Sequence, residues 1–147
     1  MMNLTYLVVE PNGIAPWRIL IHSPLGSEDK RHGVCLPRSG LDCFVVGLST
    51  HGANEGAVVN AAKAGVSRCI AGGEIKCGEI IIPDLSGLLD GAGRVATMAD
   101  ILDAQAKERV LMGVGYADED CAAGKVFNVW LSPIMLWHPK TTIGGAR

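Results

Sequence analysis

Glycine and proline residues divide this chain into short apolar runs. The 19 Gly and 7 Pro of its 147 residues are spread along the sequence and are not gathered into one linker. Runs this short suit β-strands, because helices need a longer uninterrupted stretch. The sequence therefore predicts a mainly β fold. The expected strands are Thr5–Val9, Trp17–Ile21, Gly33–Leu36, Cys43–Leu48, Ala57–Ala61, Val66–Ile70, Glu79–Ile82, Val110–Gly115 and Lys125–Leu131.

One segment departs from this pattern. Ala99–Lys107 (ADILDAQAK) places Ile101, Leu102 and several alanines at helical spacing, with few β-branched residues. Thr97 is positioned to cap a helix here, and Asp100 follows three residues later, as in a capping box. We therefore expect one short helix within the β fold.

A weak internal repeat runs through the sequence. Val45–Leu48 is followed by Gly56–Val59, and Leu111–Val114 is followed by Gly124–Phe127. Each half reads as a strand, a polar loop, a glycine and a second strand, although the spacing differs by two residues between the copies. The pattern predicts two related hairpin units packed across one core. Such a duplicated hairpin closes readily into a small barrel, because closure removes exposed strand edges.

The expected strand Lys125–Leu131 has no clearly polar face. Val129 and Leu131 lie on the face opposite Trp130. A strand with apolar residues on both faces is covered on both sides. We therefore expect the core to cover one side, and another subunit or a tail to cover the other.

Composition and charge exclude several classes of function. The chain is 48% hydrophobic and 19% charged, which is typical of one globular domain and unlike disordered chains. Its net charge of −2 and the lack of a basic run give no footprint for nucleic acid. Every apolar stretch is interrupted before the roughly 18 residues that span a bilayer. The first residues lack the pattern of a secretory signal, so we expect the protein to be made and kept in a cytoplasm.

The residues that could carry chemistry do not form a recognisable site. Five cysteines without an export signal predict free thiols, and their spacing does not suit zinc. His51, Cys43 and Cys69 have no assignable base or orienting group, and Asp118–Asp120 reads as a solvated acidic turn. We therefore predict no catalytic residue, no metal site and no cofactor, and a protein that is not an enzyme.

Both ends of the chain carry large apolar residues, although chain ends are normally polar. Leaving such side chains in water costs roughly 1.5–3 kcal/mol each. They pack either on their own domain or against another chain, and the composition of interface cores favours the second option. We predict an N-terminal arm (1–16), a β domain (17–132) and a C-terminal tail (133–147). The predicted partner or oligomer contacts are Trp17, Arg18, Ile134, Met135, Leu136 and Trp137.

A series of short glycine-containing β motifs runs between Arg18 and Ser132. In order they are Val45–Leu48, Glu55–Val59, Ala71–Ile80, Asp90–Val95, Val110–Val114 and Ala122–Val126. Taken together, these motifs resemble the capsid cement, or head-decoration, proteins of tailed bacteriophages, which show the same elements in the same order. This chain departs from the pattern in the inserted stretch Ile82–Leu89 and the helical segment before the last unit.

The resemblance implies both a fold and a function. The expected fold is a small β-barrel or β-tulip-like domain. The expected function is that of a virion structural protein, assembled in the host bacterial cytoplasm, which binds the outside of an icosahedral capsid as a homotrimer and bridges major capsid subunits. Two alternatives stay open: an enzyme or small-molecule binder built on a small barrel, and an interaction module unrelated to phage.

Overall fold

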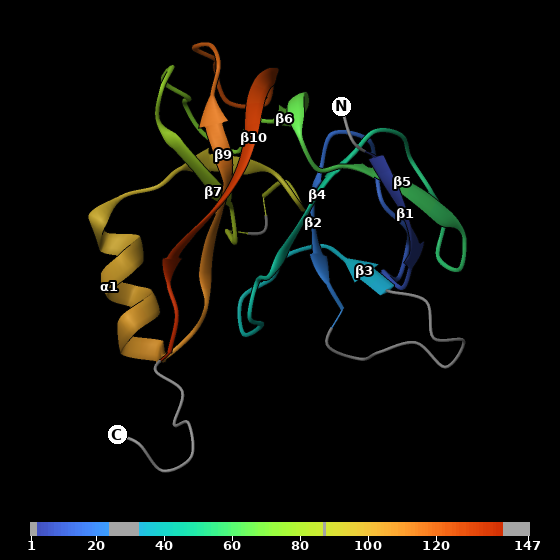
Figure 1. Ribbon diagram of the computed structural model, residues 1–147, viewed down its shortest axis with the longest axis horizontal. Helices are drawn as coiled ribbons and strands as arrows, with labels where there is room; N and C mark the ends of the chain where they lie inside the picture. The colour runs from blue at the N-terminus through green and yellow to red at the C-terminus, as the bar shows by residue number, and fades with distance from the viewer. Residues whose placement is uncertain (1–2, 24–32, 87, 140–147) are drawn as a thin grey trace.

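The structure is a computed structural model that describes residues 3–23, 33–86 and 88–139. Within these residues the fold is mainly β with one short helix, as the sequence predicts (Figure 1). The elements are β1 (Asn3–Val8), β2 (Ile19–His22), β3 (Gly33–Cys35), β4 (Val45–Ser49), β5 (Val58–Ala62), β6 (Gly65–Ile70), β7 (Ile80–Pro83), β8 (Gly93–Val95), α1 (Met98–Lys107), β9 (Leu111–Ala117) and β10 (Val126–Trp137).

The first five strands form a closed barrel in the order β1-β3-β2-β4-β5. β1 closes it, because β1 pairs with β5 in antiparallel fashion and with β3 in parallel fashion. Leu20, Val46 and Val59 point inward and pack together inside the barrel, and a register shift between β2 and β4 interrupts the alternation of inward and outward residues on β4. The predicted small barrel is therefore confirmed. We call residues 3–62 the first unit.

The remaining five strands form a second sheet in the order β6-β10-β9-β7-β8. We call residues 65–137 the second unit. Followed from β1 through β5, β4 and β2 to β3, the first unit has the same strand order, and the residue pairing across the strands is also the same. In the first unit, Leu48 pairs with Ile19 and Ala62, Ser49 pairs with Ala61, and Ile21 pairs with Cys35. At the corresponding positions of the second unit, Tyr116 pairs with Ile80 and Trp130, Ala117 pairs with Val129, and Ile82 pairs with Arg94.

Backbone hydrogen bonds outside the strands repeat as well. The Trp17 amide donates to the Ser49 carbonyl at 2.9 Å, and the Gly78 amide donates to the Ala117 carbonyl at 2.8 Å. Trp17 has φ 63° and Gly78 has φ 86°, so the same left-handed turn precedes β2 and β7. The repeat predicted from the hairpins therefore extends over five strands in each unit.

The structure corrects the predicted alignment of the repeat. Sequence comparison set Val45–Leu48 against Leu111–Val114, but strand pairing sets Gly47 against Gly115. In this register the spacing from Gly47 to Gly56 equals that from Gly115 to Gly124, so the apparent difference of two residues disappears.

The two units share one core. Ile19, Leu48 and Ala62 on the outer face of the first barrel are fully buried and belong to the same apolar cluster as the inward-facing residues of the second unit. The start of β2 also bridges an opening in the second unit. The Trp17 carbonyl accepts from the Ile70 amide at 3.0 Å, and the Ile19 amide donates to the Gly91 carbonyl at 2.7 Å.

The predicted arm and tail each contain part of a strand. Within the predicted arm (1–16), β1 is a wall of the first barrel, and the predicted boundary after residue 16 lies between β1 and β2. β10 crosses the predicted boundary after residue 132 and runs to Trp137, although its pairing with β9 shifts register between Leu131 and Ile134. Residues 140–147 of the predicted tail lie outside the described residues, and the division of the chain into arm, domain and tail stays a prediction.

Substitution of Gly115 tests the close strand contact that both units share. A Cβ at Gly115 would stand 1.9 Å from the Trp130 carbonyl oxygen, and one at Gly47 would stand 2.2 Å from that of Ala62. Because paired strands cannot easily separate, we expect Gly115→Ala to lower the free energy of unfolding by about 1–3 kcal/mol in urea titrations. Gly73→Ala is the control, since nothing lies within 4 Å of its Cβ position, and we expect a change within about 0.5 kcal/mol. Equal stabilities would contradict the close approach.

Candidate interaction surfaces

α1 begins where the sequence predicts a cap. Thr97 has extended backbone angles, and the Asp100 carboxylate accepts hydrogen bonds from its amide at 2.7 Å and its hydroxyl at 2.9 Å. The helix ends at Glu108, which takes the left-handed conformation with φ 51°. Ala104 is buried, whereas Met98 and Leu102 are exposed. The helix therefore contacts the protein along a narrow stripe.

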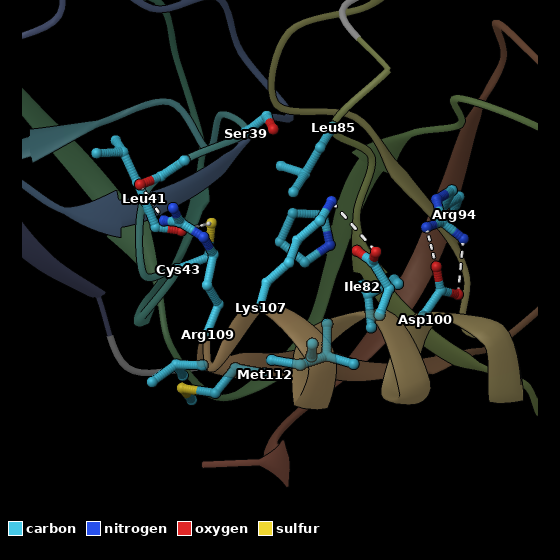
Figure 2. Close-up of a pocket in the computed structure, with 16 residues that line it drawn as sticks. Ser39, Leu41, Cys43, Ile82, Leu85, Arg94, Asp100, Lys107, Arg109 and Met112 are labelled. Atoms are coloured by element: carbon cyan, nitrogen blue, oxygen red, sulfur yellow. Dashed lines mark hydrogen bonds and ion pairs between the residues drawn. The ribbon is translucent and has the colours of Figure 1, made fainter. Parts of the chain in front are cut away.

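Arg94 ties α1 to the second sheet. Its guanidinium forms two hydrogen bonds with Asp100, one of 2.9 Å (Figure 2). Its Nε lies 3.7 Å from the buried Asp84 carboxylate. Burial raises the pKa of Asp100, but the Arg94 and Thr97 hydrogen bonds outweigh it and hold the pKa below its usual value. The carboxylate therefore stays ionised and anchors the first turn of the helix.

A small cavity lies between α1 and the first unit (Figure 2). It has a volume of about 100 Å³ and is lined by apolar side chains such as Leu41 and Met112 together with charged ones such as Asp103 and Lys107. Arg109 donates to the Gly40 carbonyl, and the Val110 amide donates to Asp42 at 3.1 Å. These bonds hold the loop before β4 against the segment after α1. The cavity therefore lies where the two units meet.

Cys43, Cys69 and His51, the residues that the sequence analysis considered for chemistry, have structural roles. Burial raises the pKa of Cys43, which lines the cavity, to about 11, and that of Cys69 to about 12, so both thiols stay protonated at neutral pH. All five cysteines are free thiols. His51 Nε2 accepts from the Asn60 amide at 3.1 Å, and its Nδ1 lies 2.8 Å from the Gly52 carbonyl.

The acidic turn also has a local role. Asp118–Asp120 is exposed, as predicted, and two of its carboxylates accept hydrogen bonds from the Cys77 and Asn128 amides. In the part of the chain that the structure describes, no group of three metal-ligating side chains is placed to hold a metal ion. None of the helices in that part is long and apolar enough to cross a membrane.

The predicted contact residues lie on two different elements. Trp17 and Arg18 precede β2 at the junction of the units, and both are half-buried. Ile134–Trp137 forms the end of β10, paired with Leu111–Gly113 of β9. Three of these four side chains are half-buried, and Met135 is 47% exposed. The structure thus packs this segment partly on its own chain, and its role in association stays a prediction.

A row of apolar side chains that the sequence analysis did not assemble crosses the second unit. Val66, Trp130, Tyr116 and Ile80 are direct neighbours on β6, β10, β9 and β7. Val66, Trp130 and Tyr116 are 39%, 58% and 41% exposed. We call these four residues the aromatic row. The sequence indicates the place of Trp130 on this surface, because Trp130 lies on the strand face opposite Val129 and Leu131. It does not indicate the other three members of the row, which lie on other strands.

Comparison with known proteins adds a similarity of fold. No family model and no curated protein sequence matches the chain. Among solved structures, the fold is similar to the crystal structure of the head fiber gp8.5 N base in bacteriophage phi29, with a TM-score of 0.59 and 17% sequence identity. The alignment covers 93% of this chain and 100% of that one. The two chains therefore share a fold over nearly their whole lengths.

Replacing Asp100 tests the anchor of α1. We expect Asp100→Asn to lower the free energy of unfolding by about 1–3 kcal/mol at pH 7, because it removes a charged partner of Arg94. The pKa of Asp100 is lower in the folded protein than in the unfolded chain, so the wild type loses this stabilisation as the pH falls below about 4. Urea titrations from pH 7 to pH 3 should show the two proteins converging.

Asp103→Asn on the same helix is the matched control. The Asp103 carboxylate lies 3.2 Å from Lys107 Nζ, and both side chains are more than half exposed. We expect a change within about 0.5 kcal/mol at either pH. An equal loss in both variants would contradict a special role for Asp100.

Proposed function

We propose that this protein is a structural component of a tailed-phage virion, which binds the outer surface of the icosahedral capsid and stabilises it by bridging major capsid subunits. The observation that carries the proposal is the shared fold with the head fiber base of phage phi29, over 93% of this chain and the whole of that one. The ordered motifs that resemble capsid cement proteins support the same conclusion from the sequence alone.

The use of the polar and reactive residues also supports a structural role. Asp100 anchors a helix, His51 bonds to backbone groups at both ring nitrogens, and burial keeps the Cys43 thiol protonated by raising its pKa. Side chains that could act as bases or nucleophiles are thus committed to holding the fold. We propose that the protein is not an enzyme and acts through surfaces alone.

The proposed partners are the major capsid protein and further copies of this chain, assembled as a homotrimer in the host cytoplasm and located on the capsid surface. A multivalent unit binds a lattice more tightly than a single copy, because the second and third contacts form at high effective concentration. Large exposed side chains such as Met135 and Trp130 suit contacts of this kind. No contact with the packaged DNA is proposed.

A ligand-binding module is the alternative, and the cavities do not favour it. The cavity of about 100 Å³ beside α1 is small compared with ligand sites of roughly 300–1,000 Å³. A wider hollow of about 620 Å³ beside Glu10 is open to solvent. Its buried Glu10 carboxylate is already paired with Arg38 and with the Leu36 amide, so it offers no free charge to a ligand.

Binding to capsid shells tests the proposed function. Purified protein is mixed with DNA-free shells assembled from the major capsid protein of the same phage, and bound protein is measured by co-sedimentation. We expect saturable binding at a fixed ratio to the capsid protein, and shells that withstand higher temperatures. A wild-type protein that stays in the supernatant would overturn the proposal.

Two methionine variants test the predicted contact residues within this experiment. We expect Met135→Glu, on the exposed end of β10, to weaken shell binding at least about tenfold, which corresponds to about 1.4 kcal/mol. Met98→Glu on α1 is the matched control, because Met98 is also exposed and lies outside the predicted contact set. Circular dichroism checks that both variants fold. Equal binding by the two would remove Met135 from the contact surface.

A further inference from the structure

The first unit uses one outer face to pack against the second unit. Ile19, Leu48 and Ala62 are neighbours on β2, β4 and β5, and each is 0% exposed. They belong to the same apolar cluster as Cys69 and Phe127 inside the second unit. This face is therefore the established unit-to-unit contact of the fold.

The aromatic row occupies the same position on the second unit. In the repeated register, Ile80 corresponds to Ile19, and Tyr116 corresponds to Leu48. Trp130 corresponds to Ala62, because Trp130 pairs with Tyr116 and Ala62 pairs with Leu48. The face that is buried in the first unit is thus open in the second, and there it carries larger apolar side chains.

We propose that the aromatic row binds the first unit of a second copy of this chain. The argument is continuity with the contact inside the chain: the fold presents this face twice, and one of the two is already packed against a unit of the same fold. A first unit from another copy supplies the next such partner. The proposal deepens the self-association in the proposed function and rests on it, but it does not require shell binding.

The receiving surface on the first unit differs from the one used inside the chain. In the second unit, β6 and β8 are the two edge strands of the sheet, and we call the gap between them the seam. The bridge between Ala71 and Gly93 joins the two sides of this seam, and the start of β2 fills the rest of it. In the first unit, β1 and β3 close the corresponding seam themselves through two parallel pairs. The aromatic row of a second copy therefore meets a closed surface of β1 and β3. Its broad side chains can lie across this surface without entering a gap between strands.

That wall carries apolar side chains of its own. Leu7 on β1 is half-buried, and its neighbour Val58 on β5 is 43% exposed. Leu7 also pairs with Gly33 across the closed seam. These two residues are the contact that we assign to the aromatic row of the neighbouring copy.

The contact is heterologous, because it joins two different surfaces of identical chains. Repetition of such a contact closes into a ring when the rotation between copies allows it, and otherwise extends as a filament. A closed ring agrees with the proposed homotrimer. A face-to-face dimer through two aromatic rows is the arrangement that this inference excludes.

Sedimentation velocity of the free full-length protein, without shells, tests whether the row holds copies together. We expect the wild type to associate at micromolar concentration and Trp130→Lys to dissociate at a concentration at least about tenfold higher. Leu102→Lys is the matched control, since Leu102 is 57% exposed and Trp130 is 58% exposed. Tyr116→Lys gives a second reading if Trp130→Lys does not fold.

A monomeric wild type, or association that is unchanged in both row variants, would overturn the proposal. Shell binding is measured separately on the same proteins. A monomeric Trp130→Lys protein that still binds shells supports the inference independently of the proposed function, and an associating wild type without shell affinity defeats only the proposed function.

Photo-cross-linking tests which surface the row contacts. A benzophenone amino acid replaces Trp130, and the cross-linked peptides between copies are identified by mass spectrometry. We expect adducts on β1 and β5 of the neighbouring copy, near Leu7 and Val58. Adducts confined to residues 65–137 of the neighbour, or no adduct between copies, would overturn the head-to-tail contact.

Discussion

The architecture depends on the burial of the outer face of the first barrel in the core of the second unit. Ile19 contributes twice, because its side chain enters the shared apolar cluster and its amide bonds to Gly91. Trp17 completes the junction by accepting a hydrogen bond from Ile70 while its own backbone is in the left-handed region. That conformation is unfavourable for an aromatic residue, and the surrounding pairing maintains it.

Much of the fold could be predicted because glycines and apolar runs are local signals. Nine of the strands lie in or near expected runs, whereas the short β8 went unassigned as a strand. The alignment of the repeat was wrong for a physical reason. Gly113 and Gly115 both fit the pattern, and the close approach of the Trp130 carbonyl to Gly115 decides between them. That contact depends on the register in which β9 pairs with β10, which the local sequence does not reveal.

The sequence analysis assigns residues 133–147 to a tail, whereas residues 133–137 form the end of β10. Proline normally interrupts a strand. Here Pro133 lies where the pairing of β10 with β9 shifts register, and such an irregularity accommodates a residue without an amide hydrogen. Capping of α1 by Thr97 and Asp100 was predictable because it is local. The Arg94 anchor was not, since it depends on how the helix lies against the sheet.

Residues 17–19 fill a gap between the edge strands of the second unit, and this makes the two units unequal. The first unit closes with its own strands, whereas the second would leave the Ile70 amide and the Gly91 carbonyl without these partners if residues 17–19 were absent. Exposed strand edges of this kind promote aggregation. Because the amino-terminal half of a chain is synthesised first, residues 17–19 precede the strands whose gap they fill. The two units repeat one strand order but are not interchangeable, since the first supplies a segment that completes the second.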